Sequence, residues 1–215
     1  MRGRPVVAYA GILVRVSTAP ERPAGPERPT GPERPAGPDR TAGPDRPPGT
    51  DGIRIRPART SDVRAMRGLV APLAEQRVLL QKEAVAYYES VGDFVVAERD
   101  GEVVGCGAIH VLWEDLAEIR TLAVSSAALG HGIGSRILER LVARAGELGV
   151  ERLFCLTFET DFFRRHGFTP IEGQAVEPSV YAELLRSYDE GVAEFLDLER
   201  VKPNTLGNTR MLRVL

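Results

Sequence analysis

The chain has 215 residues, of which 43% are hydrophobic, so it is long enough for one domain of ordinary size with its own core. Its formal net charge is -2, from 28 Lys and Arg against 30 Asp and Glu. This balance argues against a nucleic-acid-binding or membrane-surface protein, and it favours small-molecule partners.

Residues 1–52 are predicted to form a disordered leader. The opening MRGRPVVAYAGILVRV resembles a secretory signal, but Arg15 ends the apolar run and no small-residue cleavage site follows. A start codon assigned too far upstream explains these residues equally well. From Pro20 to Gly49 a six-residue unit repeats five times, each with one acid, one arginine and almost nothing apolar to bury. An extended linker is favoured over a proline-rich ligand for a partner domain.

Residues 53–215 are predicted to form one α/β domain of the α+β kind. The stretch IRIRPA alternates apolar and charged residues like a half-exposed strand. Thr60-Ser61-Asp62 offers N-cap residues for a first helix. A second helix is expected over 83–90. The turn dipeptide Asp100-Gly101 then joins two strands, DFVVAER and EVVGCGAIHVLW, as a hairpin.

The second half of the chain continues this alternation. The strand LAEIRTLAVS leads through the glycine-rich turn LGHGIG into a helix, and the strand ERLFCLTF, the short helix TDFFRRHGF and the strand FTPIEG follow. A helix near 180–188 and a final strand, TRMLRVL, complete the order β-α-α-β-β-β-α-β-α-β-α-β. This order predicts a mixed sheet with helices on its faces, and no apolar stretch approaches the ~20 residues of a membrane helix.

The glycines of the LGHGIG turn are candidates for holding phosphate. Gly130, Gly132 and Gly134 leave the backbone N–H groups at the helix N-terminus open to a pyrophosphate, which the helix dipole also favours. The alternative is that these glycines only allow close packing. A dinucleotide-binding unit would need such glycines after the first strand, and no lysine follows them as in a nucleoside-triphosphate loop.

Leu129-Gly130-His131-Gly132-Ile133-Gly134 resembles the acetyl-CoA motif of the GNAT acetyltransferases, Arg/Gln-x-x-Gly-x-Gly/Ala, at the start of the central helix. Leu129 departs from the usual Arg or Gln. A second landmark of that family is a short helix ending in Gly-Phe, here FFRRHGF, and the resemblance spans Ile53 to Leu215. It implies a GNAT fold, whose mixed central sheet is mostly antiparallel and flanked by helices, with acetyl-CoA as co-substrate.

A closer resemblance is to the short-form bacterial N-acetylglutamate synthases, and four segments carry it: LLQK, EIRTLAV, LTFETDFFRRHGF and KPNTLGNTRML. It implies transfer of an acetyl group to the α-amino group of L-glutamate, or of L-glutamine, as the first step of arginine biosynthesis. It also implies a homodimer, since GNAT enzymes often pair. The cofactor-binding residues expected on this resemblance are Leu122, Ala123, Val124, Leu129, Gly130, His131, Gly132, Ile133, Gly134, Ser135 and Phe163.

The resemblance also suggests the catalytic groups. An ammonium must lose its proton before it attacks a thioester, and Glu118 is similar in position to the family's general base, acting through a water. The alternatives for Glu118 are an exposed strand carboxylate or an ion pair with Arg120, which shares its face of the strand. Backbone N–H groups around Leu122 would meet the oxyanion. Because Phe163 occupies the position where many GNAT enzymes have a tyrosine that protonates the departing CoA thiolate, Thr157 or water is expected to supply that proton.

An acidic amino-acid acceptor calls for cationic or hydrogen-bonding groups. Lys82 and Thr209 match such positions of the family, while Arg120 and Arg210 are chosen from local charge, and Thr121 is grouped with them. Two other functions are weighed. A GNAT enzyme for another amine would want an acidic or open groove. A non-catalytic acyl-CoA-binding sensor would be consistent with Leu129 and Phe163, which occupy positions where the side chain commonly has a function in this family.

The cysteines and histidines give no sign of a metal or of disulfides. Cys106 and Cys155 lie in apolar runs, and the three histidines lack metal-ligand spacing. A covalent acetyl-cysteine route through Cys106 is disfavoured, because its run VVGCGAI is typical of a buried strand. We therefore expect a metal-free, cytoplasmic protein that transfers the acetyl group directly.

Overall fold

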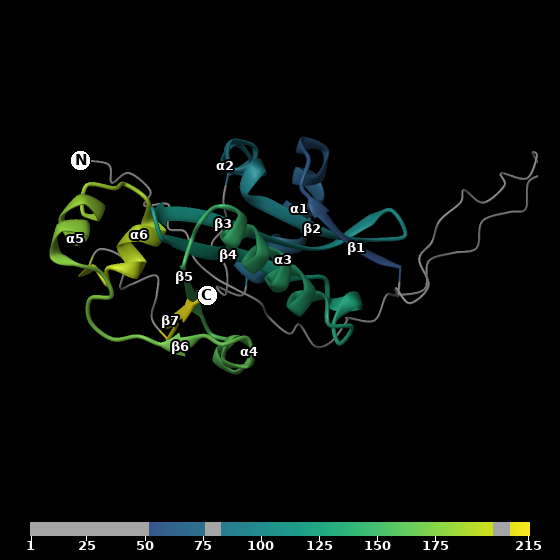
Figure 1. The fold of residues 1–215 in the computed structure, drawn as a ribbon. Helices are drawn as coiled ribbons and strands as arrows, with labels where there is room; N and C mark the ends of the chain where they lie inside the picture. The colour runs from purple at the N-terminus through teal and green to yellow at the C-terminus, as the bar shows by residue number, and fades with distance from the viewer. Residues whose placement is uncertain (1–51, 76–82, 200–206) are drawn as a thin grey trace, which may run out of the picture.

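The structure is a computed structural model that describes residues 52–75, 83–199 and 207–215. The predicted leader therefore lies outside the described residues, apart from Gly52. The same holds for the LLQK segment with Lys82 and for the loop at Lys202. The described residues form a sheet covered by helices (Figure 1).

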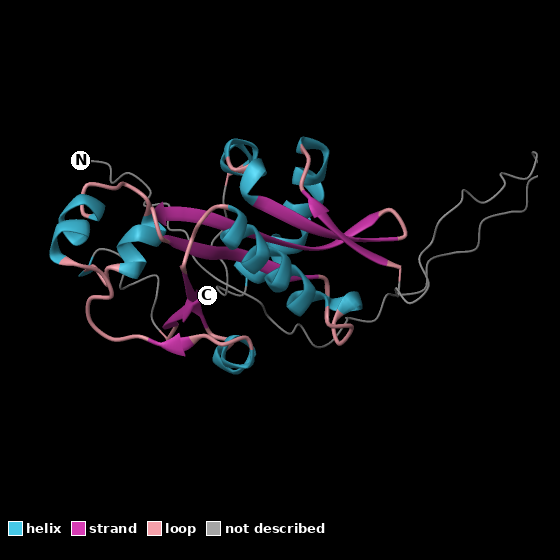
Figure 2. Cartoon of the chain, in the orientation of Figure 1, coloured by secondary structure: helices cyan, strands magenta, loops and turns pink. Residues whose placement is uncertain are grey.

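A seven-stranded sheet lies at the centre of the domain, as predicted (Figure 2). The spatial order is β1-β2-β3-β4-β5-β7-β6, and every neighbouring pair is antiparallel except β4 and β5. Asp100 and Gly101 form the predicted hairpin turn with positive φ angles of 53° and 84°. The strands are β1 (Ile53–Pro57), β2 (Phe94–Arg99), β3 (Glu102–Trp113), β4 (Leu116–Val124), β5 (Arg152–Thr157), β6 (Thr169–Pro170) and β7 (Thr209–Val214).

Helices cover both faces of the sheet and divide the core into three clusters. One face carries α3 and α4, whose aliphatic and aromatic side chains pack into the largest cluster. The opposite face carries α1 and α2 over β2 and β3, and α5 and α6 over β5. The helices are α1 (Val63–Glu75), α2 (Ala84–Glu89), α3 (Ile133–Glu147), α4 (Thr160–Arg165), α5 (Pro178–Leu184) and α6 (Glu190–Phe195).

Two predicted elements differ from the structure. The single helix expected near 180–188 is wrong: α5 ends at Leu184, and a separate helix, α6, starts after Asp189. Asp189 is the N-cap of α6, and its carboxylate accepts a hydrogen bond from the Val192 N–H at 3.1 Å, which starts a new helix. The strand expected in FTPIEG is shortened to Thr169–Pro170, where the proline has no N–H to extend the ladder.

A bulge interrupts β4 and changes which side chains face which layer. Thr121 and Leu122 together oppose a single β3 residue, Gly107, and Thr121 has a φ of 54°. Glu118 and Arg120 precede the bulge and point to the face that carries α2 and α6. Because the bulge adds one residue, the alternation reverses, and the β4 side chains packed toward α3 are Ala117, Ile119, Leu122 and Val124.

Helix α3 lies close against β3 because two glycines leave room for it. A Cβ atom at Gly105 would lie 2.9 Å from Ile137 Cδ1, and one at Gly107 would lie 2.8 Å from Ile137 Cγ2. Such distances are too short for two carbon atoms, so larger residues at these positions would push the helix away. The glycines therefore set the short distance between α3 and the sheet.

An ion-pair network holds the start of α1 against β1 and β2. Arg56 donates from Nη1 and Nη2 to the two carboxylate oxygens of Asp62, at 2.7 and 3.0 Å, and from Nε to Glu98 at 2.7 Å. Asp62 also accepts from the Arg59 N–H at 2.8 Å. The hydrogen bond from Arg56 is the main cause that lowers the pKa of Asp62, against the opposing effect of burial.

We predict that Asp62→Ala lowers the free energy of unfolding at pH 7 by about 1 to 3 kcal/mol, because it leaves Arg56 without its bidentate partner. The pKa of Asp62 is lower in the folded state, so its contribution is complete above the unfolded value near ~4 and is lost as the pH falls through the folded value. Urea unfolding at several pH values measures this. Asp161→Ala, at an exposed pair, is the control and should change nothing; an equal effect of both substitutions contradicts the prediction.

Candidate active site

The two parallel strands at the centre of the sheet separate, and the site is built around this opening. Pairing between β4 and β5 ends at Glu118 and Phe154. Beyond that point β5 continues along β7 and β4 along β3, and Figure 1 shows β5 turning away from β4. Among the described residues, the backbone of 119–124 therefore has no strand partner on its β5 side. These backbone groups are open to hydrogen bonds from a ligand.

A cavity of about 440 Å³ lies at one end of this opening, at the N-terminus of α3. Gly130 and Gly132 have positive φ angles of 82° and 69°, and Gly132 is the N-cap of α3. The N–H groups of the first helical turn have no partner within the helix, which makes this end a site for an anion. The predicted residues that line the cavity are Val124, Leu129, Gly130, Gly132, Ile133, Gly134 and Ser135.

The other predicted cofactor residues lie away from the cavity wall. Leu122 and Ala123 are buried on opposite faces of β4, and His131 is exposed, with Nδ1 3.0 Å from the Leu129 carbonyl oxygen. Phe163 is fully buried and packs against Phe168 with ring centroids 5.1 Å apart.

Residues of α4 and of the turn before it complete the cavity wall, and the sequence did not single them out. Because successive helical residues point about 100° apart, Phe162 lies at the edge of the core and lines the cavity, while its neighbour Phe163 lies wholly inside the core. The lining residues of this segment are Glu159, Asp161, Phe162 and Arg165, and Ala128, in the turn between β4 and α3, is a further lining residue that was missed.

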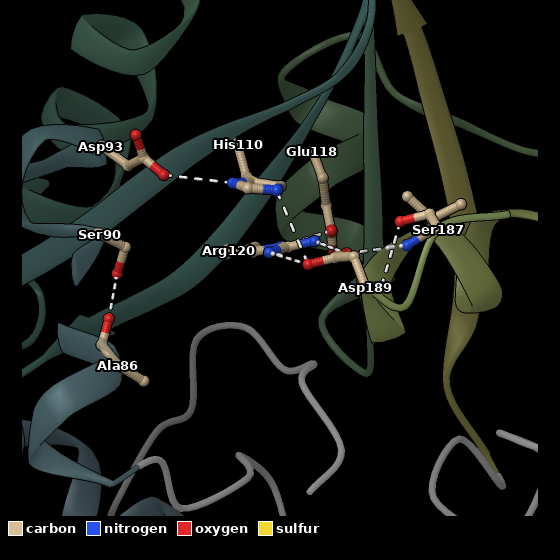
Figure 3. A network of polar contacts seen from close by, with 9 residues as sticks. Ala86, Ser90, Asp93, His110, Glu118, Arg120, Ser187 and Asp189 are labelled. Atoms are coloured by element: carbon tan, nitrogen blue, oxygen red, sulfur yellow. Dashed lines mark hydrogen bonds and ion pairs between the residues drawn. The ribbon is translucent and has the colours of Figure 1, made fainter. Parts of the chain in front are cut away.

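Glu118 is buried and lies in an ion pair with Arg120 on the face opposite α3 (Figure 3). Arg120 Nε donates to Glu118 Oε2 at 2.6 Å, while its Nη1 donates to Asp189 Oδ2 at 3.0 Å and its Nη2 donates to Asp189 Oδ1. The exposed-carboxylate interpretation of Glu118 is therefore wrong, and the ion pair is confirmed. Burial alone would lower the pKa of Arg120, but the two carboxylates raise it further than burial lowers it.

His110 extends this network toward solvent. Its Nδ1 lies 3.2 Å from Asp93 Oδ2 and its Nε2 lies 3.7 Å from Asp189 Oδ2. These groups and Arg120 line a second cavity of about 270 Å³ between α2 and the start of α6. Sequence reasoning missed His110, Asp93 and Asp189; only the N-cap character of Asp189 is a local signal.

The remaining predicted residues lie on β5, β7 and the bulge. Thr157 is fully buried and lies opposite Thr209 across the β5–β7 ladder. Its Oγ1 accepts a hydrogen bond from the Glu159 N–H at 2.8 Å. Arg210 donates to the carbonyl oxygen of Phe195 and, at 3.3 Å, to that of Gly173, and burial lowers its pKa.

Thr121 forms the bulge itself, and its carbonyl oxygen accepts from Cys106 Sγ at 3.7 Å. Both cysteines are buried, and burial raises the pKa of the Cys155 thiol well above its usual value.

In the described part of the chain, no three His, Cys, Asp or Glu side chains are grouped to hold a metal ion. No helix there has the length and apolar composition to cross a membrane.

Comparison with known proteins identifies the family. The Acetyltransferase (GNAT) family matches residues 65–168. An amino-acid acetyltransferase of Mycobacterium tuberculosis is 58% identical over 164 residues, which are 75% of this chain and 94% of that protein. The chain belongs to the GNAT family of acetyltransferases.

Particular relatives within the family carry amino-acid acetyltransferase or synthase names. The amino-acid acetyltransferase of Azotobacter vinelandii is 36% identical over 119 residues, but the match covers only 28% of that longer protein and 54% of this chain. A crystal structure of a Mycobacterium tuberculosis protein in complex with CoA and NLQ has a TM-score of 0.73 and 58% identity, covering 75% of this chain and 99% of that one.

The N-acetylglutamate synthase of Neisseria gonorrhoeae, complexed with coenzyme A and N-acetyl-glutamate, has a TM-score of 0.64 and 25% identity. The match covers 78% of this chain and 36% of the synthase. The mostly antiparallel fold expected from the sequence is thus confirmed as the GNAT fold, and this chain corresponds to about a third of that larger enzyme.

We predict that Gly132→Ala weakens CoA binding about tenfold, because a side chain at its left-handed φ costs ~1 to 2 kcal/mol and disturbs the turn. Isothermal titration with CoA measures the affinity. Gly146→Ala is the matched control on the same helix: it has ordinary φ and no atom within 4 Å of the added Cβ. Loss of thermal stability in Gly132→Ala without loss of CoA affinity would mean that the glycine serves only the backbone conformation of the turn.

Proposed function

We propose that the protein transfers the acetyl group of acetyl-CoA to the α-amino group of L-glutamate, or of L-glutamine, in the first step of arginine biosynthesis. One observation carries the proposal: the opening between β4 and β5 has a helix N-terminus at one end and a buried carboxylate, Glu118, at the other. The amino-acid acetyltransferase names of the relatives and the CoA in the two structures support the same activity.

The cofactor end of the site suits a pyrophosphate. The first turn of α3 offers its unpartnered N–H groups, and Gly130 and Gly132 keep side chains out of the way. Leu129 contributes its backbone, so the missing Arg or Gln at this position costs only a side-chain contact. In this proposal those backbone N–H groups around Leu122 to Val124 that face the open side of β4 stabilise the oxyanion of the tetrahedral intermediate.

Glu118 is proposed as the general base. The acceptor ammonium loses a proton to the Glu118 carboxylate through a water, and the neutral amine attacks the thioester carbonyl carbon. The carbon–sulfur bond then breaks, and the thiolate needs a proton. Thr157 Oγ1 accepts a hydrogen bond from the Glu159 N–H, so its own O–H proton can be donated to the sulfur, and the hydroxyl is reprotonated from water. The nitrogen still carries one proton more than the amide product, and it releases that proton to water as the intermediate collapses.

The acceptor is proposed to lie on the face that carries Glu118, between α2 and α6. Thr121, Thr209 and Lys82 remain the proposed contacts for its carboxylates, with Arg210 beside them. Arg120 is engaged by two carboxylates, so we assign it to Glu118 and not to the acceptor. We further propose a cytoplasmic homodimer in which residues 1–52 serve as a linker.

We predict that the purified protein releases CoA from acetyl-CoA with glutamate or glutamine, tested beside aspartate, ornithine and kanamycin. Glu118→Gln should lower kcat by about 10² to 10⁴-fold, because the amide cannot take a proton. Glu139→Gln, an exposed position on α3, is the control and should leave kcat unchanged. Binding of acetyl-CoA without turnover of any amine would overturn the proposed function.

Thr157 gives a separate prediction. Thr157→Val keeps the shape of the side chain but has no proton to donate, so kcat should fall about tenfold or more while the KM for acetyl-CoA stays the same. Thr157→Ser retains the hydroxyl and should keep most of the activity. Equal kcat values for the valine and serine variants would mean that water alone protonates the thiolate.

A further inference from the structure

The Arg120 guanidinium lies between two carboxylates, and this arrangement bears on the strength of the base. Nε donates to Glu118, and the two terminal nitrogens both donate to Asp189 (Figure 3). The side chains of Glu118 and Arg120 are only 2% and 8% exposed, whereas Asp189 is 25% exposed. Charges this poorly hydrated act strongly on one another.

Alone beside Arg120, the Glu118 carboxylate would be a poor proton acceptor. An adjacent cation stabilises the charged form of a carboxylate, and a carboxylate stabilised in that way takes up a proton less readily. Asp189 opposes this effect, because its negative charge offsets the positive charge of the Arg120 guanidinium on the side opposite Glu118. Burial would raise the pKa of Asp189, but its hydrogen bonds to Arg120 lower it, so Asp189 holds its negative charge.

The start of α6 is built to hold Asp189 at this place. The Asp189 carboxylate caps α6 through the Val192 N–H, and the Asp189 N–H donates to Ser187 Oγ at 3.1 Å. Two residues on, Gly191 lies against the ion pair: a Cβ atom there would collide with the Glu118 carboxylate and the Arg120 guanidinium. The first turn of α6 therefore covers the pair and keeps solvent from it.

Other titratable groups also face this cluster. His110, on β3, is within 3.7 Å of Asp189 and reaches Asp93 on its other side. Cys155, on β5, is near enough for the charge of Glu118 to raise its thiol pKa further, beyond the larger effect of burial. Glu194 is buried on α6, three residues from Gly191 and so on the same side of that helix.

We propose that Asp189 is a positioning residue for acetyl transfer: it fixes the Arg120 guanidinium and compensates its charge, so that Glu118 remains basic enough to deprotonate the acceptor. The proposal rests on the proposed function, in which Glu118 is the general base. In this proposal Asp189 acts through Arg120, to which both of its carboxylate oxygens are hydrogen-bonded.

Asp189→Asn tests the proposal, because asparagine still caps a helix but carries no charge and keeps only one of the two oxygens that accept hydrogen bonds from Arg120. The acidic limb of the kcat profile should move to lower pH by about one unit, and kcat at its plateau should fall about tenfold, since Glu118 becomes a weaker base. Asp189→Glu restores the charge and should return the midpoint toward the wild-type value. Glu183→Gln removes an exposed carboxylate on α5 and is the control for charge alone.

A second measurement does not depend on turnover. Carboxyl carbon NMR of glutamate-labelled protein, with the Glu118 signal assigned by its absence in Glu118→Gln, should show the Glu118 titration midpoint at lower pH in Asp189→Asn. An unchanged midpoint overturns the proposal, as does an increase in the KM for the amino acid without a change in the pH profile. If the wild-type protein turns over no amine, the proposed function fails, while the NMR midpoint still decides what Asp189 does to Glu118.

Discussion

The bulge in β4 is the constraint on which the site depends. Thr121 adopts a left-handed φ of 54°, which a threonine does not favour, and it adds one residue opposite Gly107. This single insertion leaves Glu118 and Arg120 on the face of α2 and α6, while Leu122 and Val124 turn to the face of α3. A regular strand could not supply side chains to both sides in this order. The proposed base and the side chains that pack against α3 therefore come from one strand but lie in different layers of the fold.

Local signals in the sequence were sufficient for most of the fold. The Asp100-Gly101 hairpin and the helix that starts after Gly132 were predicted because turn residues and apolar periodicity act over a few neighbouring positions. The cavity at the N-terminus of α3 lies at the same glycine turn, and seven of the eleven residues predicted to bind the cofactor line its wall. The names of the relatives agree with the family that those motifs indicated.

Contacts between distant segments could not be predicted in the same way. Asp189 is 69 positions from Arg120, and no periodic pattern connects them. The sequence suggested a pair between Glu118 and Arg120 from their spacing on one strand, but it could not show that a third charge completes the group. The sequence analysis expected Phe163 at the cofactor site, whereas Phe162 lines the cavity. The cause is similar, because two adjacent aromatic residues on a short helix differ only in the direction in which each points.

The glycines of β3 have a consequence for how the cavity can respond to a ligand. The Ile137 side chain packs so closely over Gly105 and Gly107 that neither position has room for a Cβ atom, so α3 has no free space in which to move toward the sheet. The wall formed by α3 is therefore stiff. The opposite wall rests on α4, a helix of only six residues. When ligands of different size enter this cavity, the adjustment in its shape should come from the α4 side and not from the α3 side.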